Sequence, residues 1–104
     1  MTAKNLPLCP VSRTAFIIGS RLTSEIIREL IEHGPRRFSD FETALPGIAP
    51  NTLSNRLKML EDHSVISRDI YDTHPPRSIY QLTDKGRKMQ PIIDAMRFWG
   101  TNNA

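Results

Sequence analysis

The chain has 104 residues, of which 38% are apolar and 24% charged, with a formal net charge of +3. This length allows one compact domain and not two, and no run approaches the roughly 18 apolar residues of a membrane-spanning helix. A modest positive charge favours a polyanionic partner without identifying one. We therefore expect a single domain over residues 1–104, in the cytoplasm and away from membranes.

The first predicted helix begins at Pro10, because the first turn of a helix tolerates proline, and it ends before Gly19. Val11 and Ala15 lie one turn apart on this helix. Cys9, the single cysteine, falls at its N-cap. Without a second cysteine it cannot form an internal disulfide, which is typical of a protein in a reducing compartment.

The second predicted helix carries a broad apolar face and should lie at the centre of the core. Ser20 can cap this helix, and a His-Gly-Pro sequence at residues 33–35 ends it. The apolar residues recur at three- and four-residue spacing and are Leu22, Ile26, Ile27, Leu30 and Ile31.

A capping box introduces a shorter third helix. Ser39 and Glu42 have the spacing at which each side chain can bond the other residue's backbone N–H. The helix is predicted from Asp40 to about Leu45, and a Pro-Gly pair at residues 46–47 breaks it.

The fourth predicted helix runs from Pro50 to about His63 and has two distinct faces, with Ile48 as an apolar plug in the turn before it. The apolar residues of one face are Leu53, Leu57 and Leu60, and the polar residues of the opposite face are Asn51, Asn55 and Lys58. The third and fourth helices together predict a helix-turn-helix over residues 39–63.

Two runs of strand-forming residues, separated by a proline-containing tip, predict a two-stranded wing over residues 65–82. Thr83 can cap a final helix over residues 84–100. The order of these elements predicts an α+β fold, mainly α, consisting of a winged helix-turn-helix with dimerisation helices at its N- and C-terminal ends.

Short motifs follow one another along nearly the whole chain, and they are Cys9-Pro10-Val11, Gly19, the Gly-Pro-Arg-Arg-Phe-Ser sequence at 34–39, Leu45-Pro46-Gly47-Ile48, Leu53, Arg56-Leu57, Leu60-Glu61, Arg68, Pro75-Pro76-Arg77, Tyr80-Gln81-Leu82-Thr83, Gly86 and Trp99-Gly100. This ordered set resembles the HxlR-type winged helix-turn-helix transcription regulators of bacteria, a MarR-like family. The resemblance implies a dimeric regulator that binds DNA.

The chain departs from the usual pattern of that family at three places. Arg21-Leu22 stands where Lys-Trp is usual, Ala49 replaces a serine before the fourth helix, and Ser64 replaces a glycine before the first wing strand. The last two changes remove no residue that is expected to contact DNA.

If the fourth helix is a recognition helix, its first two turns enter the major groove. Asparagine pairs with adenine, threonine contacts the thymine methyl group, and arginine and lysine bind phosphate or guanine. The predicted DNA-binding residues are Ser39, Pro50, Asn51, Thr52, Asn55, Arg56, Lys58 and, at the wing tip, Arg77. For Arg37 and Arg68, a surface or ion-paired role and a phosphate contact stay equally open.

Cys9 has two interpretations. The N-cap position, with the charge of Arg13 one turn later, would stabilise a thiolate. The resembled family includes redox and electrophile sensors with a cysteine at this position, which makes Cys9 a candidate redox sensor and an oxidant or small molecule a candidate signal. The alternative is a small packed residue with no signalling role.

The final helix carries more apolar surface than a small monomeric domain leaves in water, so we expect it to pair with the first helix and with their copies in a second subunit. The expected interface residues are Val11, Ala15, Met89, Ile92, Ile93, Met96 and Trp99. The alternative is that this helix packs only on its own core. A homodimer would set two recognition helices roughly 34 Å apart, or a multiple of that, on a pseudo-palindromic operator.

The sequence indicates no catalytic residues, no cofactor and no metal site. His33, His63 and His74 are isolated and expected at the surface, and no glycine-rich phosphate loop or nucleophile elbow is present. The alternatives to a sequence-specific regulator are a winged-helix protein-interaction module and a non-specific architectural DNA binder. An enzyme acting on a small molecule has the least support.

Overall fold

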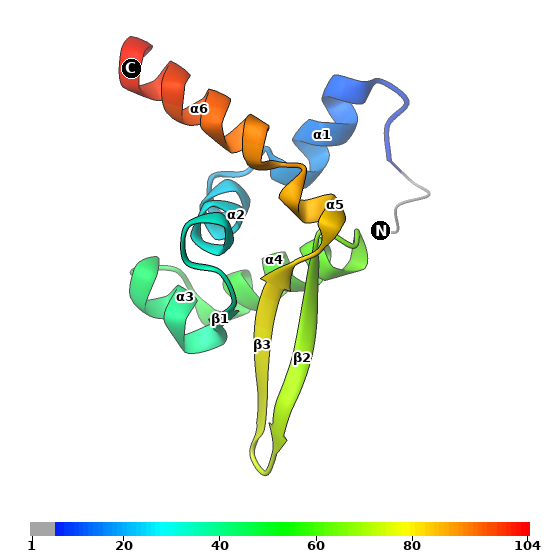
Figure 1. Cartoon of the computed structure of the whole chain (residues 1–104), viewed down its shortest axis with the longest axis vertical. Helices are drawn as coiled ribbons and strands as arrows, with labels where there is room; N and C mark the ends of the chain where they lie inside the picture. Colours follow the sequence, from blue (N-terminus) through cyan, green and yellow to red (C-terminus); the bar gives the residue numbers. More distant parts are fainter. Residues whose placement is uncertain (1–5) are drawn as a thin grey trace.

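The computed structural model describes residues 6–104, apart from the side chain of Pro76 (Figure 1). Residues 1–5 of the expected domain lie outside the described part. The elements in chain order are α1 (Pro10–Ile18), α2 (Arg21–His33), β1 (Arg36–Arg37), α3 (Phe38–Ala44), α4 (Pro50–Asp62), β2 (Ile66–Thr73), β3 (Pro76–Leu82), α5 (Asp84–Arg87) and α6 (Gln90–Asn103). None of the described helices combines the length and the apolar character needed to cross a membrane.

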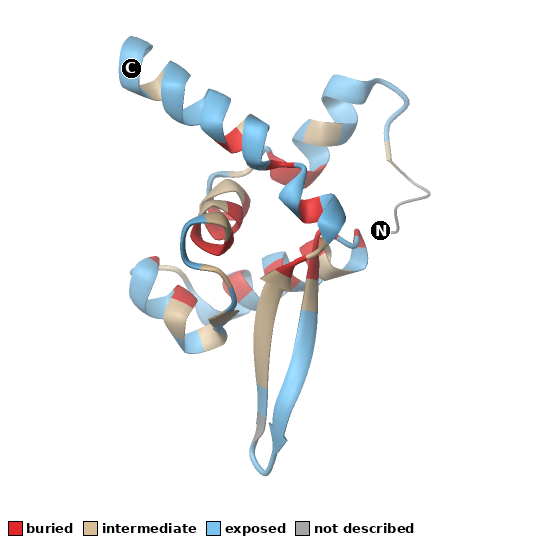
Figure 2. Cartoon of the chain, viewed as in Figure 1, coloured by how far each residue is buried: buried red, intermediate tan, exposed pale blue. Residues whose placement is uncertain are grey.

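Helix α2 lies at the centre of the fold, as its broad apolar face predicts. The hydroxyl of Ser20 caps it by accepting a hydrogen bond from the backbone N–H of Thr23 at 3.2 Å. Ile26 and Ile27 are fully buried, and α2 contacts α1, α3, α4, α6 and β3. Figure 2 shows the buried segments gathered where these elements meet.

Helix α3 begins earlier than predicted and with a different cap. Arg37 has an extended backbone and pairs with Ile79 of β3, so the helix starts at the next residue. The carboxylate of Asp40 accepts a hydrogen bond from the backbone N–H of Arg37 at 2.9 Å. The predicted capping box between Ser39 and Glu42 is therefore wrong, because the strand pairing places the cap at Arg37.

The turn between α3 and α4 has the predicted construction. Gly47 adopts a φ of 86°, which glycine reaches without steric strain. Ile48 is half-buried and packs against the core. Ala49 is the N-cap of α4, and its side chain offers no capping oxygen, so only its carbonyl joins the helix by accepting from the N–H of Leu53 at 3.1 Å.

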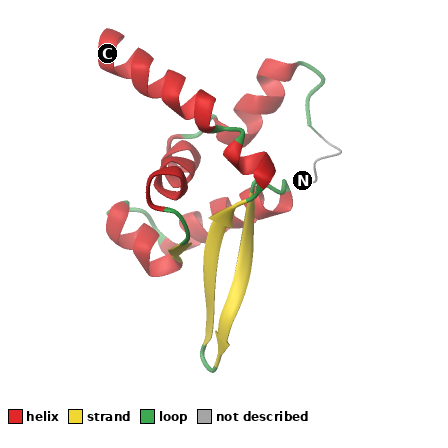
Figure 3. Ribbon diagram, viewed as in Figure 1, coloured by secondary structure: helices red, strands yellow, loops and turns green. Residues whose placement is uncertain are grey.

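The wing belongs to a three-stranded antiparallel sheet in the order β1-β3-β2, and not to a hairpin of two strands alone. In the additional strand, Arg36 pairs with Tyr80 and Arg37 with Ile79. Two consecutive arginines have no strand-forming pattern, so only the tertiary pairing reveals this strand. Figure 3 shows β2 and β3 extending together beyond the helices.

The helix predicted over residues 84–100 is interrupted and forms α5 and α6. Thr83 caps α5, since its hydroxyl accepts a hydrogen bond from the N–H of Gly86 at 3.0 Å. Pro91 lies in the first turn of α6, where its missing N–H is tolerated but where it cannot continue a preceding helix. Gly86 is required where α5 meets the sheet, because a Cβ there would overlap the carbonyl oxygen of Val65.

Two departures from the resembled family have a structural counterpart. Ser64 has a φ of 61°, the left-handed conformation in which a glycine is usual, and its carbonyl accepts a hydrogen bond from the hydroxyl of Thr83. Leu22, which replaces an aromatic residue, is buried in the core. Both positions therefore keep the structural role expected of the usual residue.

Replacing Leu57 by Ala is expected to lower the free energy of unfolding by about 2 to 5 kcal/mol, because this side chain is 1% exposed and its loss leaves a cavity. Lys58→Ala, on the exposed side of the same helix, is the control and should change it by less than about 0.5 kcal/mol. Urea unfolding followed by circular dichroism measures both variants. Equal effects would contradict the assignment of the two faces of α4.

Candidate nucleic-acid interface

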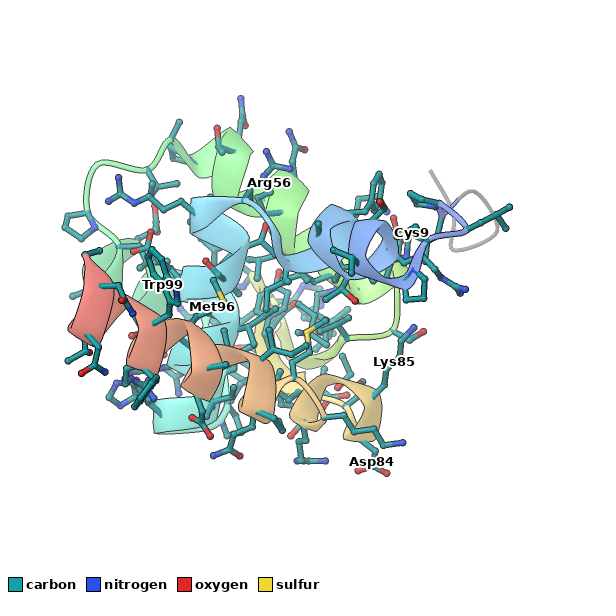
Figure 4. The ribbon with its side chains drawn as sticks, turned by 90° about the horizontal axis from the view of Figure 1, so that it is seen from above. Cys9, Arg56, Asp84, Lys85, Met96 and Trp99 are labelled. Atoms are coloured by element: carbon teal, nitrogen blue, oxygen red, sulfur yellow. The ribbon has the colours of Figure 1, made fainter. Side chains whose placement is uncertain are left out.

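Helix α4 presents a polar face at the surface because its apolar face is fully used in the core. Leu53, Leu57 and Leu60 are at most 1% exposed. The exposed residues of the other face include every residue of this helix that was predicted to bind DNA, namely Pro50, Asn51, Thr52, Asn55, Arg56 and Lys58. Arg56 is labelled on this helix in Figure 4.

The positive charges of this region differ in how far they are neutralised. Among residues 6–104, no acidic side chain forms an ion pair with Arg56 or Arg77. Lys58 lies 3.9 Å from Asp62, and both side chains are exposed, so the pair is weak. Arg68 lies 3.5 Å from Glu61, which corresponds to the ion-paired alternative for this residue.

The predicted contacts outside α4 come together in one groove. Ser39 is in the first turn of α3, and Arg77 is near the start of β3; both are exposed. They line the same groove, with a volume of about 440 Å³, between α3 and the wing. In Figure 1, α3, α4 and the wing occupy the end of the molecule opposite α1 and α6. This end therefore collects all the predicted DNA-binding residues.

Arg37 and Tyr71 form a contact that the sequence did not reveal. The guanidinium carbon of Arg37 lies 5.2 Å from the centroid of the Tyr71 ring, within the range of a cation–π interaction. Both side chains line the groove between α3 and the wing. Tyr71 lies in a run of strand-forming residues, which by itself does not indicate this contact, and Arg37 reaches it from β1, which has no strand-forming sequence pattern.

Cys9 occupies the predicted N-cap of α1, and its side chain is exposed. The backbone N–H of Ser12 lowers the pKa of the thiol, with smaller contributions from the Ser12 hydroxyl and the backbone N–H of Val11. Arg13, which was expected to contribute, is not among the groups that lower this pKa. The first turn of α1, and not Arg13, therefore lowers this pKa, although the Cys9 side chain forms no capping hydrogen bond in this structure.

The helices expected at a dimer interface divide into buried and exposed residues. Met89 and Ile93 are 9% and 5% exposed and belong to the core of the chain itself, so they are not available to a partner. Met89 is the N-cap of α6, and Ile93 lies in the first turn of this helix. Ile92 is half-buried against the same core. The exposed residues of the expected interface are Val11, Ala15, Met96 and Trp99, and Phe98, which was not predicted, is 71% exposed beside them.

The histidines are only partly where they were expected. His33 and His74 are exposed, but His63 is 1% exposed, so its prediction as a surface residue is wrong. His63 is the C-cap of α4 and is covered by α1. The Phe16 ring of α1 packs edge-on against the His63 ring, with the ring centroids 5.7 Å apart. The carbonyl of His63 also accepts a hydrogen bond from Lys85 of α5 at 2.8 Å.

One cluster in the described part of the chain has the composition of a metal site. Ligand atoms of Glu29, Glu32 and His33 lie within 4.8 Å of one another. The carboxylate of Glu29 is already paired with Arg28 at 3.0 Å and with Arg36 at 3.6 Å. Glu32 is paired in turn with an arginine of α6 at 2.6 Å. These ion pairs neutralise the two carboxylates. The pairs with Arg36 of β1 and with the arginine of α6 connect α2 to those two elements, so the cluster has a structural explanation without a metal ion.

Sequence comparison gives a family with the same architecture. The profile of the HxlR-like helix-turn-helix family matches residues 17–104. An uncharacterised HTH-type transcriptional regulator of Synechocystis is 38% identical over 95 residues, covering 91% of this chain and 70% of that protein. The HTH-type transcriptional regulator YodB of Bacillus subtilis is 34% identical over 93 residues, covering 88% and 82% respectively.

Comparison with solved structures confirms the winged helix-turn-helix fold. The redox regulator HypR in its reduced form superimposes with a TM-score of 0.85 at 33% identity, covering 91% of this chain and 93% of that chain. The reduced form of YodB from B. subtilis gives a TM-score of 0.77 at 32% identity, covering 94% and 96%. The α+β, mainly helical fold class predicted from the sequence is thus confirmed, with β1 as an addition to it.

Proposed function

Because the chain belongs to the HxlR-like helix-turn-helix family of transcriptional regulators, we propose that it binds a specific DNA site as a homodimer and releases it when Cys9 is oxidised. The chain is a regulator of transcription and not an enzyme. The observation that carries the proposal is the exposed polar face of α4, a helix that lies at the same end of the molecule as α3 and the wing.

In the proposed complex, α4 is the recognition helix and its first two turns lie in the major groove. Asn51, Thr52 and Asn55 face base edges, where an asparagine amide can pair with adenine. Arg56 and Lys58 bind phosphates or guanine, with Arg56 fully available because no carboxylate neutralises it among the described residues. Sequence preference then resides in the neutral amides, and most of the salt dependence resides in the cations.

The remaining predicted contacts fix the position of the protein on the duplex. Ser39 at the start of α3 and Arg77 on the wing line one groove, which would follow the DNA backbone beside the major groove. Pro50 opens α4 without a backbone N–H to satisfy. These contacts supply register and affinity without reading the sequence.

Dimerisation is supported by the apolar residues at the opposite end of the molecule. Met96, Phe98 and Trp99 of α6 are 46%, 71% and 63% exposed, and Val11 of α1 is 77% exposed. The C-terminal half of α6 projects from the body of the fold in Figure 1, and Figure 4 labels Met96 and Trp99 on it. A second copy of these helices would remove this surface from water and set two recognition helices roughly one DNA turn, or a multiple of it, apart.

The proposed redox response rests on the exposure and the lowered pKa of Cys9. A lowered pKa increases the thiolate fraction at neutral pH, and the thiolate is the form that reacts with oxidants. HypR, to which the chain is structurally similar, is described as a redox regulator. With one thiol per chain, two electrons pass from two thiols to the oxidant, and the product is a disulfide between subunits or with a small thiol.

Asn55→Ala is expected to weaken binding to the specific site by about 1 to 3 kcal/mol and to reduce its preference over scrambled DNA, because an asparagine that pairs with a base carries sequence information. Arg77→Ala should weaken both DNAs together and lower the slope of log K against log salt by about one. Fluorescence anisotropy with the DNA upstream of the gene and a scrambled duplex, at about 150 mM salt, measures both effects.

Gln90→Ala is the control for Asn55→Ala, because it also removes an exposed amide but lies at the start of α6. It should bind both duplexes as the unmodified protein does. Equal losses on specific and scrambled DNA for Asn55→Ala would contradict base reading by this residue. Equal binding of the unmodified protein to both duplexes would support an architectural binder, and no binding to either would support a protein-interaction module.

Trp99→Ala is expected to raise the dissociation constant of the dimer by about tenfold or more, because an exposed tryptophan in an apolar patch is a typical hot spot of an interface. Ile70→Ala is the control, since Ile70 is 57% exposed but lies on the wing. Sedimentation equilibrium measures both. An unchanged dimer in Trp99→Ala would exclude α6 as the main dimer contact.

Diamide is expected to release specific DNA from the unmodified protein and not from Cys9→Ser, because only the thiolate can transfer electrons to the reagent. The rate of release should rise with pH and level off at a lower pH than for a free cysteine, since the pKa of Cys9 is lowered. Anisotropy before and after addition of reductant measures the effect and its reversal. Release from Cys9→Ser to the same extent would dismiss this thiol as the sensor.

A further inference from the structure

The outer part of the wing has little support from the rest of the fold. Along β2, Ile66 is buried and Ser67 is half-buried, but every residue from Arg68 to Thr73 is exposed. Strand β1 accompanies β3 only as far as the pair Arg37–Ile79. Beyond that pair, β2 and β3 continue as a two-stranded arm, which extends from the body in Figure 1. A side-chain contact at this level therefore lies where the three-stranded part of the sheet passes into the two-stranded arm.

Arg37 joins three elements at this level. Its backbone N–H donates to the carboxylate of Asp40 and so begins α3. Its backbone pairs with Ile79 of β3. Its guanidinium group lies over the ring of Tyr71 on β2, with the guanidinium carbon 5.2 Å from the ring centroid. A single residue thus connects the helix-turn-helix to both strands of the arm.

Tyr71 is placed for this contact by an irregularity in β2. Ile70 pairs with Ser78 and Asp72 pairs with Arg77, so Tyr71 has no partner of its own in β3. An extra residue of this kind bends a strand and redirects the side chain that it carries. The irregularity lies just outside the last pair formed by β1, where the two-stranded arm begins.

The contact between Arg37 and Tyr71 lies in the same groove as Arg77, the wing residue that is proposed to bind DNA. Arg37, Tyr71 and Arg77 all line it, opposite residues of α3. We propose that the stack of Arg37 on Tyr71, here called the wing brace, sets the angle of the arm and thereby positions Arg77 against DNA. This inference rests on the proposed function, because Arg77 must contact DNA for its position to matter. Arg37 and Tyr71 are then positioning residues for the wing.

An experiment can distinguish the effect of the wing brace from that of a direct contact with DNA, because Tyr71 is neutral. Arg37→Ala would remove both the stack and a charge that could itself bind phosphate. A change of Tyr71 removes the stack and no charge. If Tyr71 acts by positioning Arg77, replacing Tyr71 should lower the slope of log K against log salt, although a neutral side chain displaces no counterions by itself.

Tyr71→Val is expected to weaken binding to specific and scrambled DNA by about threefold and to lower the slope of log K against log salt by about one, the value of one phosphate contact. Valine keeps a strand-forming side chain but has no aromatic face. Tyr71→Phe keeps the ring and should match the unmodified protein. In the background of Arg77→Ala, Tyr71→Val should cause no further loss. Anisotropy titrations at about 50, 100 and 200 mM salt measure these four proteins and the double variant.

A Tyr71→Val protein with an unchanged slope, or one that weakens binding equally in both backgrounds, would overturn the wing brace. If Arg77→Ala leaves the slope unchanged while the unmodified protein still prefers its specific site, the proposed function stands and the inference fails. If the unmodified protein binds no specific site, the proposed function itself fails and the inference with it. Thermal unfolding of each variant shows that the losses do not arise from a smaller folded fraction.

Discussion

Burial of the apolar face of α2 is the interaction on which the rest of the structure depends. Ile26 and Ile27 are fully buried, and each side chain of this kind contributes about 1.5 to 3 kcal/mol when it leaves water. Helices α1 and α6 pack on α2 from one end of the molecule, and α3, α4 and β3 pack on it from the other. The surface proposed for dimerisation is therefore held in a fixed relation to the surface proposed for DNA. In a homodimer, that relation would set the distance between the two recognition helices.

The wing depends on a smaller and more local set of interactions. It is anchored at its base by buried Ile66 and by the pairing of β1 with β3. Its outer half has exposed side chains on β2 and relies on the stack between Arg37 and Tyr71. An arm with few packing contacts can change direction at little energetic cost. Helix α4 is packed firmly on the core, whereas the outer wing has few packing contacts. This contrast explains why Tyr71, a neutral residue, can matter for the proposed contact of Arg77 with DNA.

Helix α1, which has Cys9 at its N-cap, contacts the C-terminal end of α4, the helix with the polar face. Phe16 of α1 packs edge-on against His63 at the end of α4, and Lys85 of α5 binds the carbonyl of the same residue. His63 is buried by this contact, although nothing in its local sequence distinguishes it from a surface residue. Helix α1, which has Cys9 at its N-cap, and the end of α4 are therefore joined by one packed aromatic pair.

The sequence by itself determined the position and type of most elements, because capping residues such as Ser20 and Thr83 and the apolar spacing of α2 and α4 are local properties. It also determined which face of α4 is polar, and with it most of the proposed DNA contacts. Only the tertiary structure decided that two arginines form a strand, that His63 is buried, and that the apolar residues of the last helix are divided between core and surface. The physical reason is that periodicity within one element specifies which side chains share a face, whereas burial and strand pairing depend on which distant element covers that face.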